Sequence, residues 1–326
     1  CRRFWVFMKR LTRGRAMVHW HGKTYGFLPH KMWVLLIFAA WFLGSGVVGC
    51  TGKKVILPRV SHEPTEIRHV GKFIWFDLFT RDLPGACAFY GHLFGWSFED
   101  TAPGDPEIKT IKYDGIAIGN AVQTKPEAGK TAVSRWLSSM SVADVDETVE
   151  RVVKNGGSIR MPPKDIPHRG RLAWVDDPEG APFAVLTASQ GDPPDRPYMP
   201  SCWMGSELWT HHVEGALKFY GHLVGYQPET RKVGGALSYL LLFKDDQPRG
   251  GMVKIPWKDV KPNWVPYIGV RDIEAIVEKA EKLGGKVLVP LDPDREDDVT
   301  ILADPSGAVF GVQQLKAIAN RGGNPS

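Results

Sequence analysis

The strongest constraint on the fold of this chain is an internal repeat. The pentapeptide FYGHL stands at Phe89–Leu93 and again, 130 residues later, at Phe219–Leu223. The likeness extends over the longer stretches 75–96 and 204–226, which share the order of apolar, acidic and glycine residues. Because self-similarity at a fixed spacing marks repeated structural units, we expect two modules of the same architecture.

Each module has the pattern of a strand, a helix and three further strands, and then the same order again. In the first module, residues 73–79 alternate between two faces, and Asp82 stands where it can cap a following helix. Apolar side chains recur at helical spacing up to Gly95, which is placed to end that helix. A second unit begins at Arg135, and Asp144 caps its helix. The pattern therefore predicts paired βαβββ units and an α+β fold.

The 326 residues are enough for two domains that each have a core. The shift in composition and the repeat together define the expected boundaries. We predict a leader at 1–49, a linker at 50–66, a first domain at 67–191, a linker at 192–200, a second domain at 201–316 and a tail at 317–326.

The net charge of +5 comes from the N-terminal region. Residues 1–49 contain basic side chains and no acidic ones, so the rest of the chain is slightly acidic. A basic surface for nucleic acid is therefore not predicted. The four cysteines have no disulfide or CxxC spacing, and we expect Cys87 and Cys202 to be buried free thiols.

The N-terminal region resembles a bacterial lipoprotein signal. A basic stretch precedes an apolar run at 32–49, and the sequence VVGC ends at Cys50. The resemblance implies a lipid on Cys50, which would anchor the domains to a membrane of the cell envelope, on its extracytoplasmic side. An uncleaved membrane anchor is the alternative, with the same placement. Because the chain begins with Cys rather than Met, a start that lies elsewhere is a further alternative.

The order of motifs in both modules resembles the vicinal oxygen chelate superfamily. The resemblance rests on three motifs: the FYG helix, the GG pair after the second helix, and the DP-x-GA turns at Asp177 and Asp304. This superfamily includes glyoxalase I, extradiol dioxygenases and bleomycin-resistance binding proteins. The resemblance covers 67–316 and implies two tandem domains, each with an open sheet curled into a trough that holds the ligand. It says little about chemistry, because one fold supports many functions.

The resemblance also implies where metal ligands would lie. Enzymes of the superfamily take His and Glu ligands from the first and fifth strands and from closing strands. The corresponding positions here are Trp75, Leu137 and Ala184 in the first module and Gly205, Val265 and Gly311 in the second. None of these side chains binds a divalent ion. We therefore predict no metal and no other cofactor, with a divalent metal held by unusual ligands as the alternative.

Two acidic residues remain as catalytic candidates. Asp77 and Glu207 each follow the first-strand metal position by two residues, so each shares its strand face. An acid in an apolar trough could act as a general base or hold a cation. The alternative is a structural role through hydrogen bonds. On a loop of the first module, Arg169 and its neighbours could meet an anionic ligand at the trough mouth, or could simply be solvated.

Aromatic residues suggest a small-molecule site. Trp75 and Phe79 are expected to line one trough and Trp209 the other, with Trp136, Tyr239 and Trp264 as further candidates for the walls. Filling of the space that a metal would take is the alternative. We thus predict a metal-independent protein that binds a small apolar or aromatic molecule, as a monomer with paired domains. A lyase, isomerase or dioxygenase and a structural interaction module remain as alternatives.

Overall fold

The computed structural model describes residues 57–101, 107–125, 134–232, 238–291 and 299–315. The chain divides into two compact units, Cys1–Lys54 and Val55–Ser326, and all described residues belong to the second. The predicted leader and Cys50 lie outside the described residues. Within the described ranges, none of the helices has the length and apolar character needed to cross a membrane.

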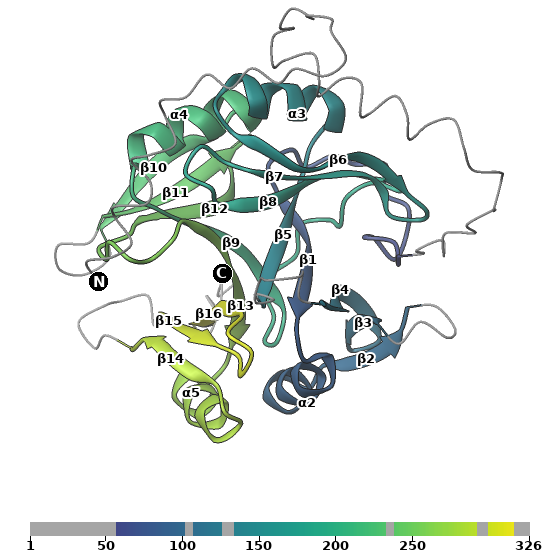
Figure 1. Cartoon of the computed structure of the whole chain (residues 1–326), viewed down its shortest axis with the longest axis vertical. Coiled ribbons are helices and arrows are strands. Elements are labelled where there is room, and N and C mark those ends of the chain that lie inside the picture. Colours follow the sequence, from purple (N-terminus) through teal and green to yellow (C-terminus); the bar gives the residue numbers. More distant parts are fainter. Residues whose placement is uncertain (1–56, 102–106, 126–133, 233–237, 292–298, 316–326) are drawn as a thin grey trace, which may run out of the picture. The chain divides into compact units, whose positions relative to one another are not determined.

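The first domain forms one sheet with two helices. Its strands are ordered β2-β3-β4-β1-β5-β8-β7-β6 (Figure 1). The elements are β1 (Phe73–Thr80), α2 (Leu83–Phe94), β2 (Ser97–Asp100), β3 (Ile108–Tyr113), β4 (Ile116–Gln123), β5 (Arg135–Ser141), α3 (Val145–Lys154), β6 (Ser158–Ile166), β7 (Gly170–Asp176) and β8 (Pro182–Ala188).

The second domain repeats this arrangement, with the strand order β10-β11-β12-β9-β13-β16-β15-β14. Its elements are β9 (Trp203–Thr210), α4 (Val213–Val224), β10 (Gln227–Lys232), β11 (Ser238–Lys244), β12 (Gln247–Lys254), β13 (Asn263–Val270), α5 (Ile273–Lys282), β14 (Lys286–Val289), β15 (Val299–Ala303) and β16 (Val309–Gln314). The α+β fold and the duplicated βαβββ units are confirmed. The strand β10 was not predicted.

Each sheet is mixed. In the first, β1 runs parallel to β4 and antiparallel to β5, and β5 runs parallel to β8. The second sheet has the same pairings among β9, β12, β13 and β16. The two βαβββ units of each domain therefore meet through their first strands, which puts β1 and β5, or β9 and β13, at the middle of the sheet.

Local sequence explains the helix boundaries. The side chain of Asp82 accepts a hydrogen bond from Gly85 N at the start of α2, and Asp144 does the same for Glu147 N at the start of α3. Gly95 and Gly225 take left-handed backbone angles and end α2 and α4. These caps confirm the predicted boundaries of the helices.

The two faces of each sheet have different roles. Side chains on one face join the helices in a core that runs through both domains. Side chains on the other face form a separate, smaller apolar cluster in each domain, and we call this face the trough side. In β1, Phe76 and Leu78 belong to the core, whereas Trp75 packs in a separate cluster on the trough side. Strand alternation then places Asp77 and Phe79 on the trough side as well.

The repeated motifs join the two domains. Helix α2 lies beside α5, and α3 lies beside α4 (Figure 1). The Tyr90 hydroxyl of the first FYG motif donates to Asp304 Oδ2 of the second domain at 3.3 Å. Reciprocally, the Tyr220 hydroxyl donates to Asp177 Oδ2 of the first domain at 3.1 Å. Each FYG helix is thus bonded to the DP turn of the other domain.

Candidate functional site

Strand register defines the floor of the first trough. Trp75 lies opposite Ser139, and Ser139 lies opposite Ala184, so these three residues form one row across β1, β5 and β8. Leu137, the expected fifth-strand position, lies instead opposite Asp77. The row through Trp75 and Ala184 therefore passes through Ser139 and not through Leu137. In the row itself, one large indole stands beside two small side chains.

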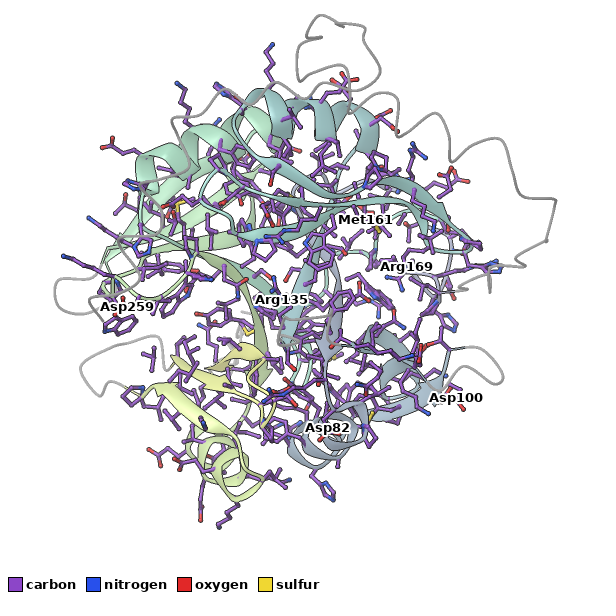
Figure 2. All side chains as sticks on the ribbon, in the orientation of Figure 1. Asp82, Asp100, Arg135, Met161, Arg169 and Asp259 are labelled. Carbon is purple, nitrogen blue, oxygen red and sulfur yellow. The ribbon has the colours of Figure 1, made fainter. Side chains whose placement is uncertain are left out.

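A buried polar network surrounds Trp75. Its indole N–H donates to Asp77 Oδ1 and to Asn120 Oδ1, both at 3.1 Å. Arg169 enters the same network from the turn before β7, and its Nη2 donates to Asn120 Oδ1 at 2.8 Å. Figure 2 labels Arg169 among the side chains of the first domain. The sequence predicted Arg169 either at the mouth of the trough or on a solvated loop, but only 2% of it is exposed.

The electrostatics of this network are dominated by burial. The Arg169 guanidinium lies 4.0 Å from the centroid of the Trp75 ring, in cation–π contact. Burial lowers the pKa of Arg169 to about 10, although the Asp77 charge opposes this change. Burial raises the pKa of Asp77, while Arg169 and the Trp75 hydrogen bond lower it. In both groups, burial therefore disfavours the charged form.

The first trough is filled at its centre. Arg169 Nε donates to the carbonyl oxygen of Pro58 at 2.9 Å. Val60 is buried in the cluster that contains Trp75 and Leu186. At another point along the same face, Phe79 stacks on Trp174 with ring centroids 5.4 Å apart. Trp75 and Phe79 thus lie on the predicted face, but Trp75 is covered by the chain itself.

The floor of the second trough is arranged differently. Tyr267 of β13 lies opposite Gly205 on one side and Gly311 on the other. A Cβ atom on Gly311 would lie 2.6 Å from the Tyr267 ring, so the ring occupies the space of a side chain there. A Cβ atom on Gly205 would meet no atom of the described residues within 4 Å. The row therefore leaves space at Gly205, where the first domain has Trp75.

Glu207 is the centre of the polar contacts in this trough. Its Oε1 accepts hydrogen bonds from Trp209 Nε1 and from the Tyr267 hydroxyl, both at 2.8 Å. Burial, and next the Glu207 charge, raise the pKa of Tyr267 well above its ordinary value. Tyr267 is therefore a protonated donor at neutral pH. Val265, which was predicted as the fifth-strand metal position of the second module, lies opposite Glu207.

An aromatic wall extends outward from Glu207. Trp209 stacks on Trp257 with an interplanar angle of 14° and a centroid distance of 6.1 Å. Trp257 is 47% exposed, which is unusual for a large apolar side chain. Tyr239 of β11 lies against Gly251, where a Cβ atom would be 2.1 Å from its hydroxyl oxygen. Trp209 and Tyr239 are thus partly buried beside Glu207 and its strand partner.

Two predicted wall residues lie elsewhere. Trp136 and Trp264 belong to the core on the helix side, where their N–H groups donate to Tyr90 and Tyr220 at 2.9 and 2.8 Å. The expectation that they line the troughs is therefore wrong. The reason is alternation along the strand, because each follows or precedes a trough-facing residue and must point the other way.

The same geometry determines which metal ligands the troughs could offer. Across the residues that the structure describes, no group of three or more His, Cys, Asp or Glu side chains is arranged to hold a metal ion. The first trough holds a guanidinium beside Asp77, and a second cation would be repelled there. In the second trough, the row of Gly205, Tyr267 and Gly311 supplies no imidazole or carboxylate. The donor set therefore does not fit the three-ligand centre that the fold implies.

The fold and site define a class of protein with two tandem, trough-forming domains built from βαβββ pairs. The sequence profile of the Glyoxalase/Bleomycin resistance protein/Dioxygenase superfamily matches residues 67–185. A candidate glyoxylase of Mycobacterium bovis, CFP32, is 31% identical over 241 residues, which cover 73% of this chain and 92% of that protein. The chain therefore belongs to this superfamily, as its motifs predicted.

Two further relatives extend the comparison. The anthracycline biosynthesis protein DnrV of Streptomyces peucetius is 28% identical over 257 residues, or 74% of this chain and 92% of that protein. The solved structure of 2,2',3-trihydroxybiphenyl 1,2-dioxygenase from Sphingomonas wittichii strain RW1 is 12% identical, with a TM-score of 0.54. It covers 76% of this chain and 91% of the dioxygenase chain. At this identity, the dioxygenase shows a shared fold alone.

Proposed function

We propose that this protein binds a small, planar aromatic molecule in the second trough, without a metal ion. The observation that carries the proposal is the row of Gly205, Tyr267 and Gly311, in which a Cβ atom on Gly205 would meet no described atom within 4 Å, on the strand that also carries Glu207. In the first trough, the corresponding space is taken by Trp75 and covered by residues of the chain.

The lining of the second trough fits such a ligand. Trp209 and Trp257 offer a stacked aromatic wall, and aromatic rings favour offset stacking with a flat partner. The Glu207–Tyr267 pair gives one negative acceptor and one hydroxyl group to orient a ligand that carries a hydroxyl of its own. The relative that is named for anthracycline biosynthesis supports a flat aromatic ligand, because anthracyclines contain fused aromatic rings.

The proposal can be tested with 2-naphthol as a probe, by isothermal titration calorimetry on the full chain. We expect saturable binding that weakens about tenfold in Tyr267→Phe, since loss of one hydrogen bond corresponds to about 1.4 kcal/mol. Trp209→Leu should weaken it further. The matched control is Phe79→Leu in the first trough, which should leave the affinity unchanged. Equal affinity in wild type and in both second-trough variants would place the ligand elsewhere.

We also propose that a lipid on Cys50 tethers the domains to a membrane. The supporting observation is the basic and apolar leader that ends in VVGC. Expression with a radiolabelled fatty acid should label the protein and place it in the membrane fraction. Cys50→Ser should abolish the label. Membrane association that persists without any label would favour an uncleaved anchor instead.

A further inference from the structure

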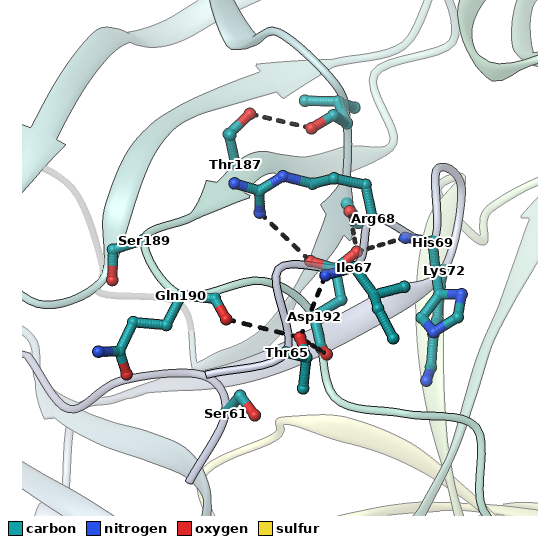
Figure 3. A network of polar contacts seen from close by, with 12 residues as sticks. Ser61, Thr65, Ile67, Arg68, His69, Lys72, Thr187, Ser189, Gln190 and Asp192 are labelled. Atoms are coloured by element: carbon teal, nitrogen blue, oxygen red, sulfur yellow. Dashed lines mark hydrogen bonds and ion pairs between the residues drawn. The ribbon is translucent and has the colours of Figure 1, made fainter. Parts of the chain in front are cut away.

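The residues before β1 form a strap, defined here as residues 57–70, that is attached to the end of the first domain. The Thr65 hydroxyl donates to Asp192 O at 2.8 Å, and Thr65 N donates to Gln190 O at 2.9 Å. His69 N donates to Asp192 Oδ2 at 2.6 Å (Figure 3). Asp192 is fully buried, so these bonds are shielded from water.

Gly191 allows the strap to approach this closely. Its φ angle is +84°, in the left-handed region that favours glycine. A Cβ atom at this position would lie 2.3 Å from Thr65 Oγ1 and 2.5 Å from Glu66 N. Any side chain at position 191 would therefore push the strap away from the sheet.

Beyond this attachment, the strap enters the first trough and contacts Arg169 and the apolar cluster there. The Pro58 carbonyl accepts a hydrogen bond from Arg169 Nε, and Val60, which is 7% exposed, packs in the apolar cluster of Trp75 and Leu186. The strap thus supplies one oxygen to the guanidinium and one apolar side chain to the wall. A small molecule with an oxygen group and an apolar body could make the same two contacts.

Arg169 indicates the charge of such a molecule. Its hydrogen bonds within the described ranges go to two uncharged oxygens, Asn120 Oδ1 and Pro58 O. Asp77 accepts from Trp75, and its charge acts on Arg169, but the described part of the chain has no ion pair within 4.0 Å between these two side chains. A buried guanidinium whose direct hydrogen bonds go to uncharged oxygens is costly even with Asp77 nearby, whereas a carboxylate placed on its fork would form a charge-assisted bond. The geometry therefore favours an anion.

We propose that the first trough is a second binding site, for a small aromatic monocarboxylate that displaces residues 57–60 from Arg169. The carboxylate would replace the Pro58 carbonyl, and the ring would take the place of Val60 against Trp75. A monoanion fits better than a phosphate dianion, because Asp77 lies nearby and Leu172, Leu186 and Ala188 make the surroundings apolar. This site is separate from the second trough and does not depend on the function proposed for it.

The test uses 2-naphthoate and a pair of glycine variants. Gly191→Ala should loosen the strap without changing any residue of the trough. Gly180→Ala is the matched control, because Gly180 has a φ of +87° but no atom of the described chain within 4 Å of a Cβ. We expect 2-naphthoate to bind Gly191→Ala at least tenfold more tightly than it binds wild type or Gly180→Ala, by titration calorimetry. Thr65→Val, which removes one bond of the strap, should act in the same direction more weakly.

Two further measurements identify the site. On the Gly191→Ala background, Arg169→Gln should lower the affinity for 2-naphthoate at least tenfold, whereas Tyr267→Phe should leave it unchanged. In wild type, saturating 2-naphthoate should raise amide hydrogen exchange in the peptide that covers residues 57–70. Affinity that is equal in Gly191→Ala and Gly180→Ala would overturn the proposal. So would binding that survives Arg169→Gln or that leaves exchange in the strap unchanged.

Discussion

The substitution Tyr220→Phe removes one hydroxyl group from the contact between the domains. Tyr220 is fully buried, and its hydroxyl accepts from Trp264 Nε1 at 2.8 Å while it donates to Asp177 Oδ2 at 3.1 Å. Asp177 Oδ1 is already bonded to the backbone N–H groups of Glu179 and Ala181 in the DP turn. The hydroxyl therefore links a tryptophan of the second domain to a turn of the first.

The expected loss of stability follows from the two bonds. Phenylalanine keeps the ring packing but leaves the Trp264 N–H buried without an acceptor, which costs about 1–3 kcal/mol. A hydrogen bond to an acidic side chain contributes about 1.5–3 kcal/mol. Because the two bonds share one atom, their effects do not simply add. We expect the free energy of unfolding to fall by about 2–4 kcal/mol.

Urea unfolding followed by far-ultraviolet circular dichroism measures this change. The midpoint should fall by roughly 1 M at an unchanged slope, as one transition that includes both domains. Tyr198→Phe is the control, because Tyr198 is 53% exposed and its substitution should change the free energy by less than about 0.5 kcal/mol. If the urea midpoint of Tyr220→Phe equals that of Tyr198→Phe, or if the two domains unfold in separate transitions, the Tyr220 hydroxyl does not join the domains in this way.

Three other predictions follow from the same contacts. Burial raises the pKa of Asp77 above its ordinary 3.8 in the folded protein. The protonated carboxyl group therefore favours the folded state at low pH, and this stabilisation is lost as the pH rises through the raised pKa. In urea unfolding, the free energy of unfolding of Asp77→Asn relative to wild type should therefore increase from pH 3.5 to pH 7. A difference between the two proteins that stays constant over this range would contradict the prediction. Glu179→Ala should lower the free energy of unfolding by about 1–2 kcal/mol in the same assay, because Glu179 Oε2 accepts the backbone N–H groups of His211 and His212 just before α4. An unchanged midpoint would show that these bonds do not stabilise the fold. Burial raises the pKa of Cys87 from 9.0 to about 11, so a thiol reagent at pH 8 should react with it about a hundredfold more slowly than with a free peptide thiol, and equal rates would exclude the burial argument.

The fold was predictable because several independent patterns agree along the chain. The caps Asp82 and Asp144 and the terminator Gly95 mark helix boundaries through local hydrogen bonds and backbone angles, which the residue type largely determines. Because the sequence pattern is repeated, much of this local evidence occurs once in each domain. The strand Gln227–Lys232 lacks this support, since its sequence QPETRK is polar and contains a proline, and its place is determined by pairing with β11.

The site was harder to predict, because it depends on contacts between distant residues. Alternation already implied that Val265 and Trp264 face opposite sides, and the same rule would have indicated Tyr267 as a trough residue. Arg169 is different. Its sequence position suggested a solvated loop, and only the turn before β7 together with the strap brings its side chain to Asn120 and Pro58. Nothing local in the sequence distinguishes a buried arginine from an exposed one.

If both proposals hold, the two troughs of the duplicated domain have different binding specificities. Each floor row contains one large aromatic residue, but this residue is Trp75 on the first strand of one domain and Tyr267 on the fifth strand of the other. The indole in the first row brings an N–H donor to Asp77 and a ring face to Arg169, so that trough holds a buried cation. The phenol in the second row brings its O–H donor to Glu207, so that trough keeps a carboxylate, on the same strand as the open position at Gly205. The first trough adds the cation Arg169 to its acid Asp77, whereas the second pairs its acid Glu207 with the neutral Tyr267. We therefore expect the two troughs to select flat molecules of different charge. Substitution of Arg169 should change the affinity of the first trough alone, and substitution of Glu207 that of the second alone.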